Sequence, residues 1–206
     1  GPDGRIYLAE MSRILAFDPA HPEAAEAVVD GLPDNRLHEN RHPLSSFIFD
    51  GDGALLVNVG APSDRCMTPA GAPQRDARGQ CAESAEQGMV RRYAPEGRGR
   101  WSRTWTVYAS GLRNSVALVR HSSGALYQAE NSVDLATPDR PFDEINRLIP
   151  GAHYGWPYCT DMATVLPGWT AAQARCAART APVSLLPPHA APLAILYYDG
   201  AMFPEL

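Results

Sequence analysis

The sequence predicts an all-β protein. Short apolar runs follow glycine-centred turns at several places, and no long stretch shows the 3.6-residue periodicity of an amphipathic helix. The 206 residues include 19 prolines and 17 glycines, which interrupt helices and mark turns. A helical solenoid or a parallel α/β sheet would need long amphipathic segments, and the sequence lacks them.

A turn centred on glycine and followed by an apolar strand occurs three times. The copies are residues 2–8, 51–57 and 122–127. Asp-Gly or Ser-Gly before a run of β-forming residues is a hairpin signal. Successive turn glycines are 49 and 71 residues apart. The first interval fits one four-stranded blade of a β-propeller, and the second fits a blade with a long insertion.

Each turn has a further apolar strand nearby. We expect these strands at Ile14–Phe17, Phe47–Phe49 and Val116–Val119. Helix is indicated only weakly, as one short segment within residues 21–29 and another within residues 169–178. The prediction is therefore a set of short strands joined by turns.

We expect residues 1–206 to form a single, incomplete β-propeller domain. Propellers usually have four to eight blades, and at roughly 50 residues a blade this chain covers about three to four. A small, complete four-bladed propeller is the alternative. Loop insertions are expected near residues 61–88 and 158–180, where the chain is rich in proline, glycine and alanine.

The four cysteines fall into two pairs, Cys66 with Cys81 and Cys159 with Cys176. Each pair flanks one of the loop insertions, and neither has the Cys-x-x-Cys spacing of a zinc site or a redox motif. We favour two local disulfides, which would place the protein in an oxidising compartment, periplasmic or secreted. Four unpaired cysteines in a cytosolic protein are the alternative.

Composition argues against two kinds of partner. The formal net charge is −5 and no segment is rich in Lys and Arg, so nothing indicates nucleic-acid binding. No apolar run approaches the length of a membrane span. The first residues, Gly1–Gly4, are a turn signal rather than a leader, so we expect any export signal to have been removed or to lie outside this chain.

Two polar clusters are candidates for catalysis. His42 stands before the expected strand at Phe47–Phe49, and histidine is the natural general base near neutral pH; His38 is a competing candidate. Arg113 and Asn114 follow a turn, where a fixed guanidinium can stabilise negative charge and an amide can orient a planar ligand. For each cluster taken alone, the alternative is an ordinary solvated loop.

A third cluster carries oxygen ligands. The segments Glu130–Ser132 and Asp143–Glu144 bracket a polar loop, and calcium prefers carboxylate and carbonyl oxygens. The spacing is not that of an EF-hand, so a solvated acidic loop is the alternative. The run His153–Cys159, with aromatic residues around a glycine and a proline, predicts a rigid loop rather than a helix or strand.

Together these clusters resemble the glucose/sorbosone dehydrogenases. The resemblance is carried by His42 and four motifs in order: Gly-Leu-Arg113-Asn114, Ala-Glu130-Asn131-Ser132, Asp143-Glu144-Ile-Asn and His-Tyr154-Gly-Trp156-Pro. The doubled cysteines and the aromatic run are closer to the sorbosone-type branch. The resemblance implies a six-bladed propeller enzyme that uses pyrroloquinoline quinone (PQQ) and calcium.

The resemblance also implies roles in catalysis. His42 would be the general base that removes the proton from the anomeric hydroxyl of a sugar, while hydride passes to PQQ. Arg113 would lie beside the quinone oxygens and stabilise the reduced, anionic cofactor. Asn114 and Asn131 would belong to the cofactor pocket.

For calcium, the resemblance implies two positions. The backbone carbonyls of Ser132 and Val133 would bind the calcium that also binds PQQ, although the family commonly has Gly-Pro at these positions. Glu144 and Tyr154 match a further, structural calcium. The basic residues that hold the PQQ carboxylates would come from later blades.

The leading functional prediction is a PQQ-dependent sugar dehydrogenase that oxidises an aldose and passes electrons to a cytochrome or a quinone. We expect this chain alone to be inactive, because it would lack half of the cofactor cradle. One alternative is a non-catalytic propeller of the same lineage that serves as a binding module. The other is a lactonase-like propeller hydrolase that uses calcium without a quinone.

Overall fold

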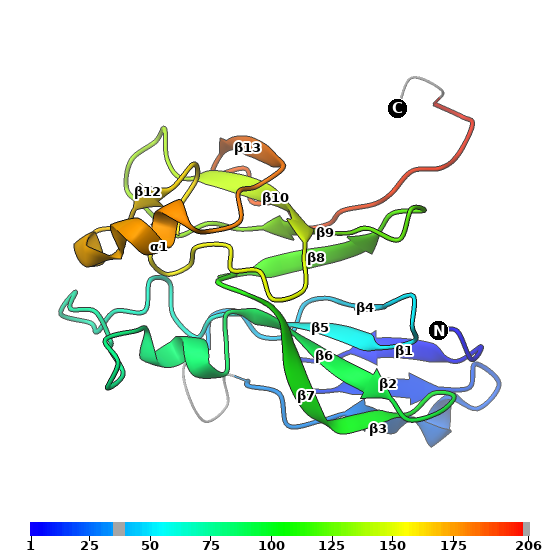
Figure 1. Ribbon diagram of the computed structural model, residues 1–206. Helices are drawn as coiled ribbons and strands as arrows, with labels where there is room; N and C mark the ends of the chain where they lie inside the picture. Colours follow the sequence, from blue (N-terminus) through cyan, green and yellow to red (C-terminus); the bar gives the residue numbers. More distant parts are fainter. Residues whose placement is uncertain (35–39, 204–206) are drawn as a thin grey trace.

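The computed structural model describes residues 1–34 and 40–203, and its architecture is a β-propeller of which three blades are present (Figure 1). Each blade is an antiparallel sheet of strands that follow one another in the chain. The all-β prediction of about three to four blades is confirmed.

The first sheet contains β1 (Ile6–Ala9), β2 (Ile14–Phe17) and β3 (Glu26–Val29). The second contains β4 (Phe47–Phe49), β5 (Leu55–Val59), β6 (Met89–Pro95) and β7 (Trp101–Ser110). The third contains β8 (Ser115–Arg120), β9 (Leu126–Glu130), β10 (Phe142–Leu148) and β13 (Ser184–Pro188). A small hairpin, β11 (Cys159–Thr160) with β12 (Thr164–Val165), and short helices η1 (Pro22–Ala24), η2 (Ala82–Ala85), η3 (Thr170–Ala172) and α1 (Gln173–Ala177) complete the structure.

The repeated glycine-centred turn explains where three of the strands begin. Gly4, Gly53 and Gly124 have φ angles of +89°, +83° and +86°, a backbone conformation that glycine adopts without strain. Each glycine precedes a strand: β1, β5 and β9. In the second and third blades these strands pair with a preceding strand, β4 or β8, whereas β1 lies at the edge of its sheet.

The helical predictions are right in one place and wrong in the other. Residues 170–177 form η3 and α1 inside the second cysteine loop, as predicted. Within residues 21–29 only η1 is helical, and the rest is the strand β3. The sequence Glu-Ala-Val-Val ends in β-branched residues that fit a pleated sheet, and Val29 is buried against β2.

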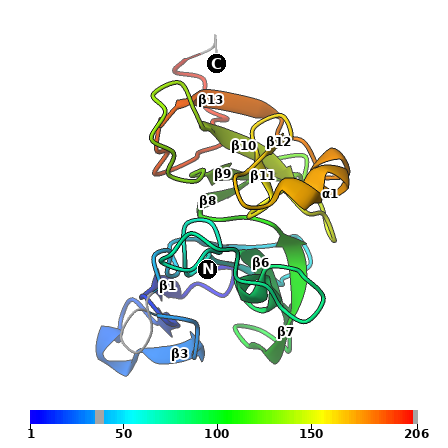
Figure 2. The ribbon, with the colours of Figure 1, turned by 90° about the vertical axis from the view of Figure 1, so that its left-hand side faces the viewer.

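The apolar side chains form three clusters. One lies between the first and second sheets and includes Ile14, Leu55 and Trp101. Another lies between the second and third sheets, where β4 contacts β8, and includes Leu56 and Leu118. Figure 2 shows the two sheets one above the other, with β8 on the side of the third sheet nearest the second. Adjacent blades are therefore held together face to face by buried apolar surface.

The third cluster joins the two loop insertions. Both predicted disulfides, Cys66–Cys81 and Cys159–Cys176, are present and are buried in this cluster together with Trp156. The two disulfide loops, residues 61–88 and 158–180, lie side by side at one end of the molecule, on the left of Figure 1. A direct hydrogen bond from the Cys81 backbone N–H to the Tyr158 hydroxyl, 3.0 Å long, connects them.

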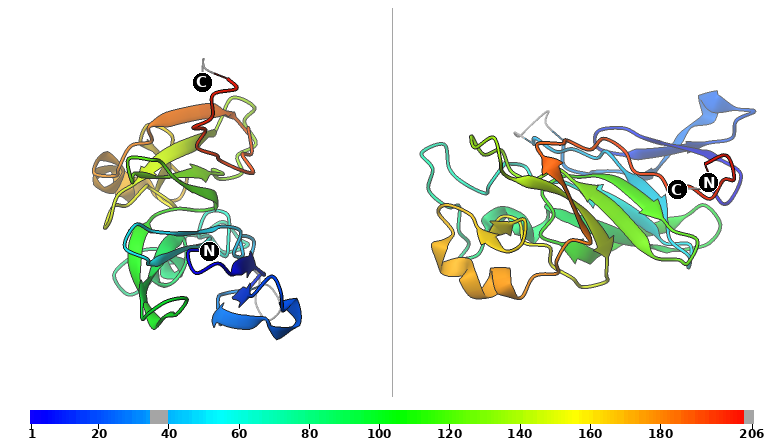
Figure 3. Two further views of the ribbon diagram at one scale, coloured as in Figure 1. Left: turned by 90° about the vertical axis from the view of Figure 1, so that its right-hand side faces the viewer. Right: turned by 90° about the horizontal axis from the view of Figure 1, so that it is seen from above.

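After β13 the chain continues as an extended segment outside the sheets (Figure 3). Tyr197 contacts the turn before β9 through the His121 ring, 4.3 Å away, and the Ser122 hydroxyl. Leu193 and Leu196 are each 83% exposed, so this segment leaves apolar side chains in solvent.

Candidate active site

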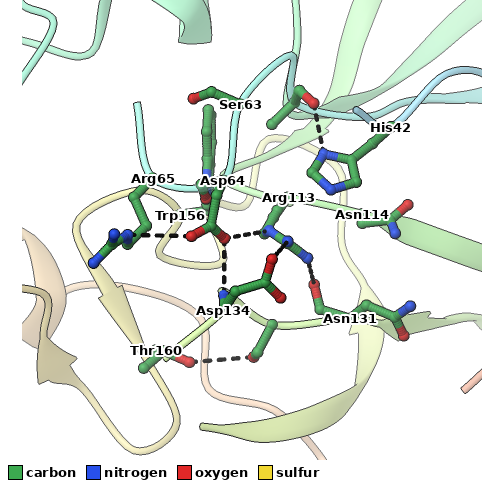
Figure 4. A network of polar contacts seen from close by, with 12 residues as sticks. His42, Ser63, Asp64, Arg65, Arg113, Asn114, Asn131, Asp134, Trp156 and Thr160 are labelled. Atoms are coloured by element: carbon green, nitrogen blue, oxygen red, sulfur yellow. Dashed lines mark hydrogen bonds and ion pairs between the residues drawn. The ribbon is translucent and has the colours of Figure 1, made fainter. Parts of the chain in front are cut away.

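The candidate site lies where the polypeptide leaves β5, β7 and β9 (Figure 4). Gly60 and Ala61 follow β5, the turn containing Arg113 and Asn114 joins β7 to β8, and Asn131 follows β9. The neighbouring ends of three strands therefore place side chains from three separate motifs together.

Gly60 and Ala61 connect His42 to Arg113. The imidazole Nδ1 of His42 lies 2.6 Å from the carbonyl oxygen of Ala61, and the Ala61 N–H donates to the carbonyl of Arg113 at 2.7 Å. A side chain at Gly60 would place its Cβ only 2.5 Å from the backbone oxygen of His42 and 3.2 Å from that of Arg113. Glycine therefore permits the close approach of the two segments.

His42 is held as a neutral base. A carbonyl oxygen accepts but cannot donate, so Nδ1 carries the proton in its contact with Ala61 and the lone pair is on Nε2. Burial, with a second contribution from the positive charge of Arg113, lowers the pKa of His42 to about 4. At neutral pH this histidine is therefore unprotonated, with its lone pair on Nε2.

The guanidinium of Arg113 is surrounded by oxygen atoms. Its Nε lies 2.9 Å from Oδ1 of Asp64, a charge contact rather than an aligned hydrogen bond. Its Nη2 lies 3.3 Å from Oδ2 of Asp134, and its Nη1 donates to the carbonyl of Asn131 at 3.2 Å. The residue is 6% exposed, so its orientation is fixed by the protein.

Glu130 holds the backbone of the Arg113 turn. The carboxylate accepts hydrogen bonds from the backbone N–H groups of Arg113 and Asn114 and from the Ser115 hydroxyl. Burial raises the pKa of Glu130 to about 8, against the opposing effect of the Asn114 hydrogen bond. This carboxyl group lies at the end of β9 and sets the position from which the Arg113 side chain projects.

The two asparagines predicted for the cofactor pocket lie next to each other. The backbone N–H of Asn131 donates to the carbonyl of Asn114 at 3.1 Å, so the two residues are in adjacent chain segments. The side-chain oxygen of Asn131 is buried and has no hydrogen-bond partner among the described residues. A buried amide oxygen without a partner is costly unless a ligand or water supplies one.

A small cavity of about 20 Å³, with room for one water molecule or one ion, is lined in part by Arg113 and Glu130. Four of its lining residues are those for which the sequence resemblance implied calcium contacts: Ser132, Val133, Glu144 and Tyr154. The resemblance implied two calcium positions, whereas the structure places all four residues around this one cavity.

Glu144 and Tyr154 differ in whether their polar atoms could contact an ion in this cavity. Glu144 is buried, and burial raises its pKa to about 7. The Tyr154 hydroxyl donates to the carbonyl of Arg147 and accepts from the N–H of Ile149, so it is already engaged away from the cavity. A contact from Tyr154 to an ion would therefore use its backbone carbonyl.

The aromatic loop before Cys159 packs against the turn that carries Arg113. The backbone of Trp156 donates to the carbonyl of Gly111, and its indole N–H donates to the carbonyl of Asp64 at 2.9 Å. A Cβ at Gly88 would lie 2.7 Å from the Trp156 ring, so glycine is needed there as well. The loop forms neither a helix nor a long strand before Cys159, and it connects the Arg113 turn to the first disulfide loop.

Sequence reasoning missed two acidic residues at the site, Asp64 and Asp134. They come from loops 49 and 21 residues away from Arg113, and nothing in their local sequence marks them as ion-pair partners. His38, the competing candidate base, lies outside the described residues. Cys66, Cys81 and Glu83 come together as metal-type side chains, but the two cysteines form a disulfide and offer no thiolate.

The family model for glucose/sorbosone dehydrogenases matches residues 15–206. The chain belongs to this family. The match covers every motif on which the resemblance in sequence was based, from His42 to Trp156. A search of the curated protein sequences finds no match.

Solved structures of the same fold include several sugar dehydrogenases. The PQQ domain of pyranose dehydrogenase from Coprinopsis cinerea, in its holo form, has a TM-score of 0.70 and 18% identity, and the match covers 96% of this chain and 55% of that domain. The PQQ-bound aldose sugar dehydrogenase from Streptomyces coelicolor has a TM-score of 0.54 and 22% identity, with 90% and 50% covered. The soluble aldose sugar dehydrogenase from Escherichia coli, in its apo form, has a TM-score of 0.61 and 18% identity, with 98% and 57% covered.

The chain spans 50–57% of the length of these structures. At identities this low the similarity establishes the propeller fold. In the part of the chain that the structure describes, no helix has the length and apolar character needed to cross a bilayer.

Proposed function

We propose that this family member is part of a PQQ-dependent dehydrogenase that oxidises an aldose or related sugar at the anomeric carbon. The observation that carries the proposal is the pairing of a neutral, buried histidine with a buried guanidinium across Gly60 and Ala61. A base and a cation in adjacent positions suit a reaction in which a hydroxyl loses its proton while negative charge develops nearby.

His42 would accept the proton of the anomeric hydroxyl on Nε2. Its Nδ1–H contact with Ala61 fixes the ring and keeps the lone pair on Nε2 available. When bound, PQQ supplies the two-electron acceptor for the hydride that leaves the anomeric carbon. Loss of that hydride and of the hydroxyl proton converts the sugar to a lactone.

The described residues fit the quinone end of PQQ. Arg113 provides a buried positive charge, and the unpartnered amide oxygen of Asn131 lies beside the same turn. Asn114 is half-buried next to both residues and would orient a planar ring. The carboxylates of PQQ need further cations, which we propose come from blades beyond these three.

The residues around the cavity of about 20 Å³ fit calcium. Calcium binds carboxylate and carbonyl oxygens, and this cavity has the Glu130 and Glu144 carboxyl groups on its lining. The backbone carbonyls of Ser132 and Val133 accept no backbone hydrogen bond from the described residues. Calcium would act there as a Lewis acid and as a structural link between the β9 and β10 ends.

The disulfides support an oxidising compartment, periplasmic or secreted. Electrons would then leave to a cytochrome or a quinone. The described chain has no Cys-x-x-Cys-His haem site of its own, because all four cysteines are in disulfides.

The test is reconstitution of the full-length protein, with the blades proposed beyond these three, with PQQ and calcium, followed by reduction of a dye with a panel of aldoses. Aldose-dependent dye reduction that disappears after calcium is removed with a chelator is the expected result. Bound PQQ with no dye reduction by any aldose would exclude the dehydrogenase and favour a binding module. Lactone hydrolysis without PQQ would instead identify a calcium-dependent hydrolase.

A further inference from the structure

Asp64 is an acidic residue of the first disulfide loop that contacts the guanidinium of Arg113. The side chain of Asp64 is 13% exposed and that of Arg113 is 7% exposed, so solvent screens this ion pair little. The other carboxylate on the same guanidinium, that of Asp134, is 75% exposed. Because exposed ion pairs contribute little, Asp64 is the stronger electrostatic partner.

The backbone of Asp64 is held by the second disulfide loop and the aromatic loop before it. Its carbonyl accepts the indole N–H of Trp156 at 2.9 Å, and the next carbonyl, that of Arg65, accepts the indole N–H of Trp169 at 3.2 Å. Cys66, two residues after Asp64, forms the disulfide with Cys81. Two indole donors and a disulfide therefore hold this short segment; Figure 4 shows Trp156 next to Asp64.

The Asp64 carboxylate also organises the loop after β9. Its Oδ1 accepts the backbone N–H of Asp134 at 2.9 Å, while its Oδ2 pairs with the Nε of Arg65 at 3.1 Å. The loop that contains Ser132 and Val133 is thus tied to the same carboxylate as Arg113. One side chain links the residues proposed for the quinone and those proposed for calcium.

We propose that Asp64 is a positioning residue, which fixes the Arg113 guanidinium in the orientation that the reaction requires. The proposal rests on the proposed function, because Arg113 is assigned there to the quinone. In this role the packed disulfide loops hold the Asp64 carboxylate, which belongs to the second blade, against Arg113, which lies between the second and third blades. Asp64 therefore acts through Arg113 and needs no contact of its own with substrate or cofactor.

The first experiment needs no cofactor. Rotation about the Nε–Cζ bond of Arg113, measured by NMR in wild type and in Asp64→Asn, reports how firmly the guanidinium is held. We expect faster rotation in Asp64→Asn and a smaller change in Asp134→Asn, which removes the same charge from an exposed position. Equal rotation rates in wild type and Asp64→Asn would overturn the proposal whether or not the protein oxidises sugars.

The second experiment uses the PQQ-loaded protein and measures the midpoint potential of the bound cofactor. If Asp64 only screens charge, Asp64→Asn leaves Arg113 in place with its full charge, and the potential rises. If Asp64 positions Arg113, the guanidinium moves away from the quinone, the reduced form loses stabilisation, and the potential falls. We expect the fall, with kcat reduced by roughly 10- to 100-fold and KM little changed. A rise or no change in potential would overturn the proposal.

Asp64→Glu is the control for the case in which Asp64→Asn unfolds the protein. It keeps the charge and lengthens the side chain by one methylene. The positioning role predicts that the potential falls in this variant too, while far-UV circular dichroism and the melting temperature confirm a folded protein. A wild-type potential and kcat in folded Asp64→Glu would contradict it. Absence of PQQ binding in the wild-type protein would instead reject the proposed function, and the rotation measurement would still decide the role of Asp64.

Discussion

At the scale of single residues, the environment of His42 decides how the site can work. The ring is buried beside a guanidinium, and both effects favour the neutral form. A histidine that stays neutral to low pH can act as a base throughout the physiological range, although its low basicity requires that the anomeric hydroxyl be activated by its surroundings. Arg113, whose positive charge acts more strongly on His42 than that of Arg41, could supply this electrostatic support.

This environment gives a prediction for the pH dependence of kcat/KM. The acid limb of the profile should fall with an apparent pKa near 4, because the depressed pKa keeps His42 unprotonated until the pH drops through that value. A profile of aldose oxidation from pH 3.5 to pH 8 in the PQQ-loaded protein measures it. An acid limb centred near the ordinary histidine value of about 6.5 would show that His42 is not the titrating base.

The same burial also affects stability. A histidine whose pKa is lowered in the folded state favours folding above about pH 6.5. That contribution is lost as the pH falls toward 4, because the unfolded chain binds the proton first. Activity and stability should therefore both decline on the acid side, with stability declining at the higher pH.

The sequence points to candidate site residues more readily than to their partners. His42 and Arg113 belong to motifs that can be read locally, whereas Asp64 and Glu130 act through contacts that depend on the fold. Glu130 was visible only as part of an acidic cluster, and its hydrogen bonds to the Arg113 turn require β8 and β9 to pair in register. Such partners cannot be predicted without knowing which loops meet.

At the scale of elements, the close contact at Gly60 is the feature most sensitive to change. It follows β5 and separates the segment of His42 from the turn of Arg113. The atoms that an added Cβ would meet include backbone oxygens, which cannot rotate away as a flexible side chain can.

We expect Gly60→Ala to destabilise the protein by about 1–3 kcal/mol, because the backbone must shift to accept the methyl group. Urea unfolding of the two proteins measures this difference. Gly51→Ala is the matched control: the nearest atom to its Cβ is the flexible end of Arg120, so its effect should be much smaller. Equal stability of Gly60→Ala and wild type would mean that His42 and Arg113 are not held as closely as described.

Strands next to glycine turns were predicted from sequence, and strands without such turns were not. β2 and β4 have the predicted bounds because they are short apolar runs beside a turn. β13 contains two prolines and pairs with β10 across the whole second disulfide loop, so its local sequence gives no strand signal. The sequence of β3 has a weak local preference for helix, which is why it was predicted as helix. In the structure, pairing with β2 overrides that preference.

At the scale of the whole molecule, the described residues expose apolar side chains on the edge strand β1 and in the segment after β13. On the edge strand β1, Ile6 is 46% and Leu8 is 51% exposed, and the segment after β13 exposes Leu193 and Leu196. An unpaired strand edge with apolar side chains is a template for association with another chain.

We therefore predict that the 206-residue chain associates in solution in a concentration-dependent way. Substitution of both β1 residues, Ile6→Lys with Leu8→Lys, should reduce the association because edge lysines oppose strand pairing. Light scattering after size-exclusion chromatography measures the mass. The control is Met11→Lys, since Met11 is 42% exposed but lies in a turn off the strand edge. A wild-type chain that stays monomeric at every concentration would contradict the prediction.

The central claim is that His42 removes a proton in a PQQ-dependent sugar oxidation, and the rate of cofactor reduction in a single turnover tests it most directly. Full-length wild-type and His42→Ala proteins, loaded with PQQ, are mixed with excess aldose, and the absorbance of the bound cofactor is followed. The prediction is similar PQQ affinity in both proteins and a rate of reduction lower by about 10²- to 10⁴-fold in His42→Ala. Equal rates of reduction in the two proteins would contradict the claim.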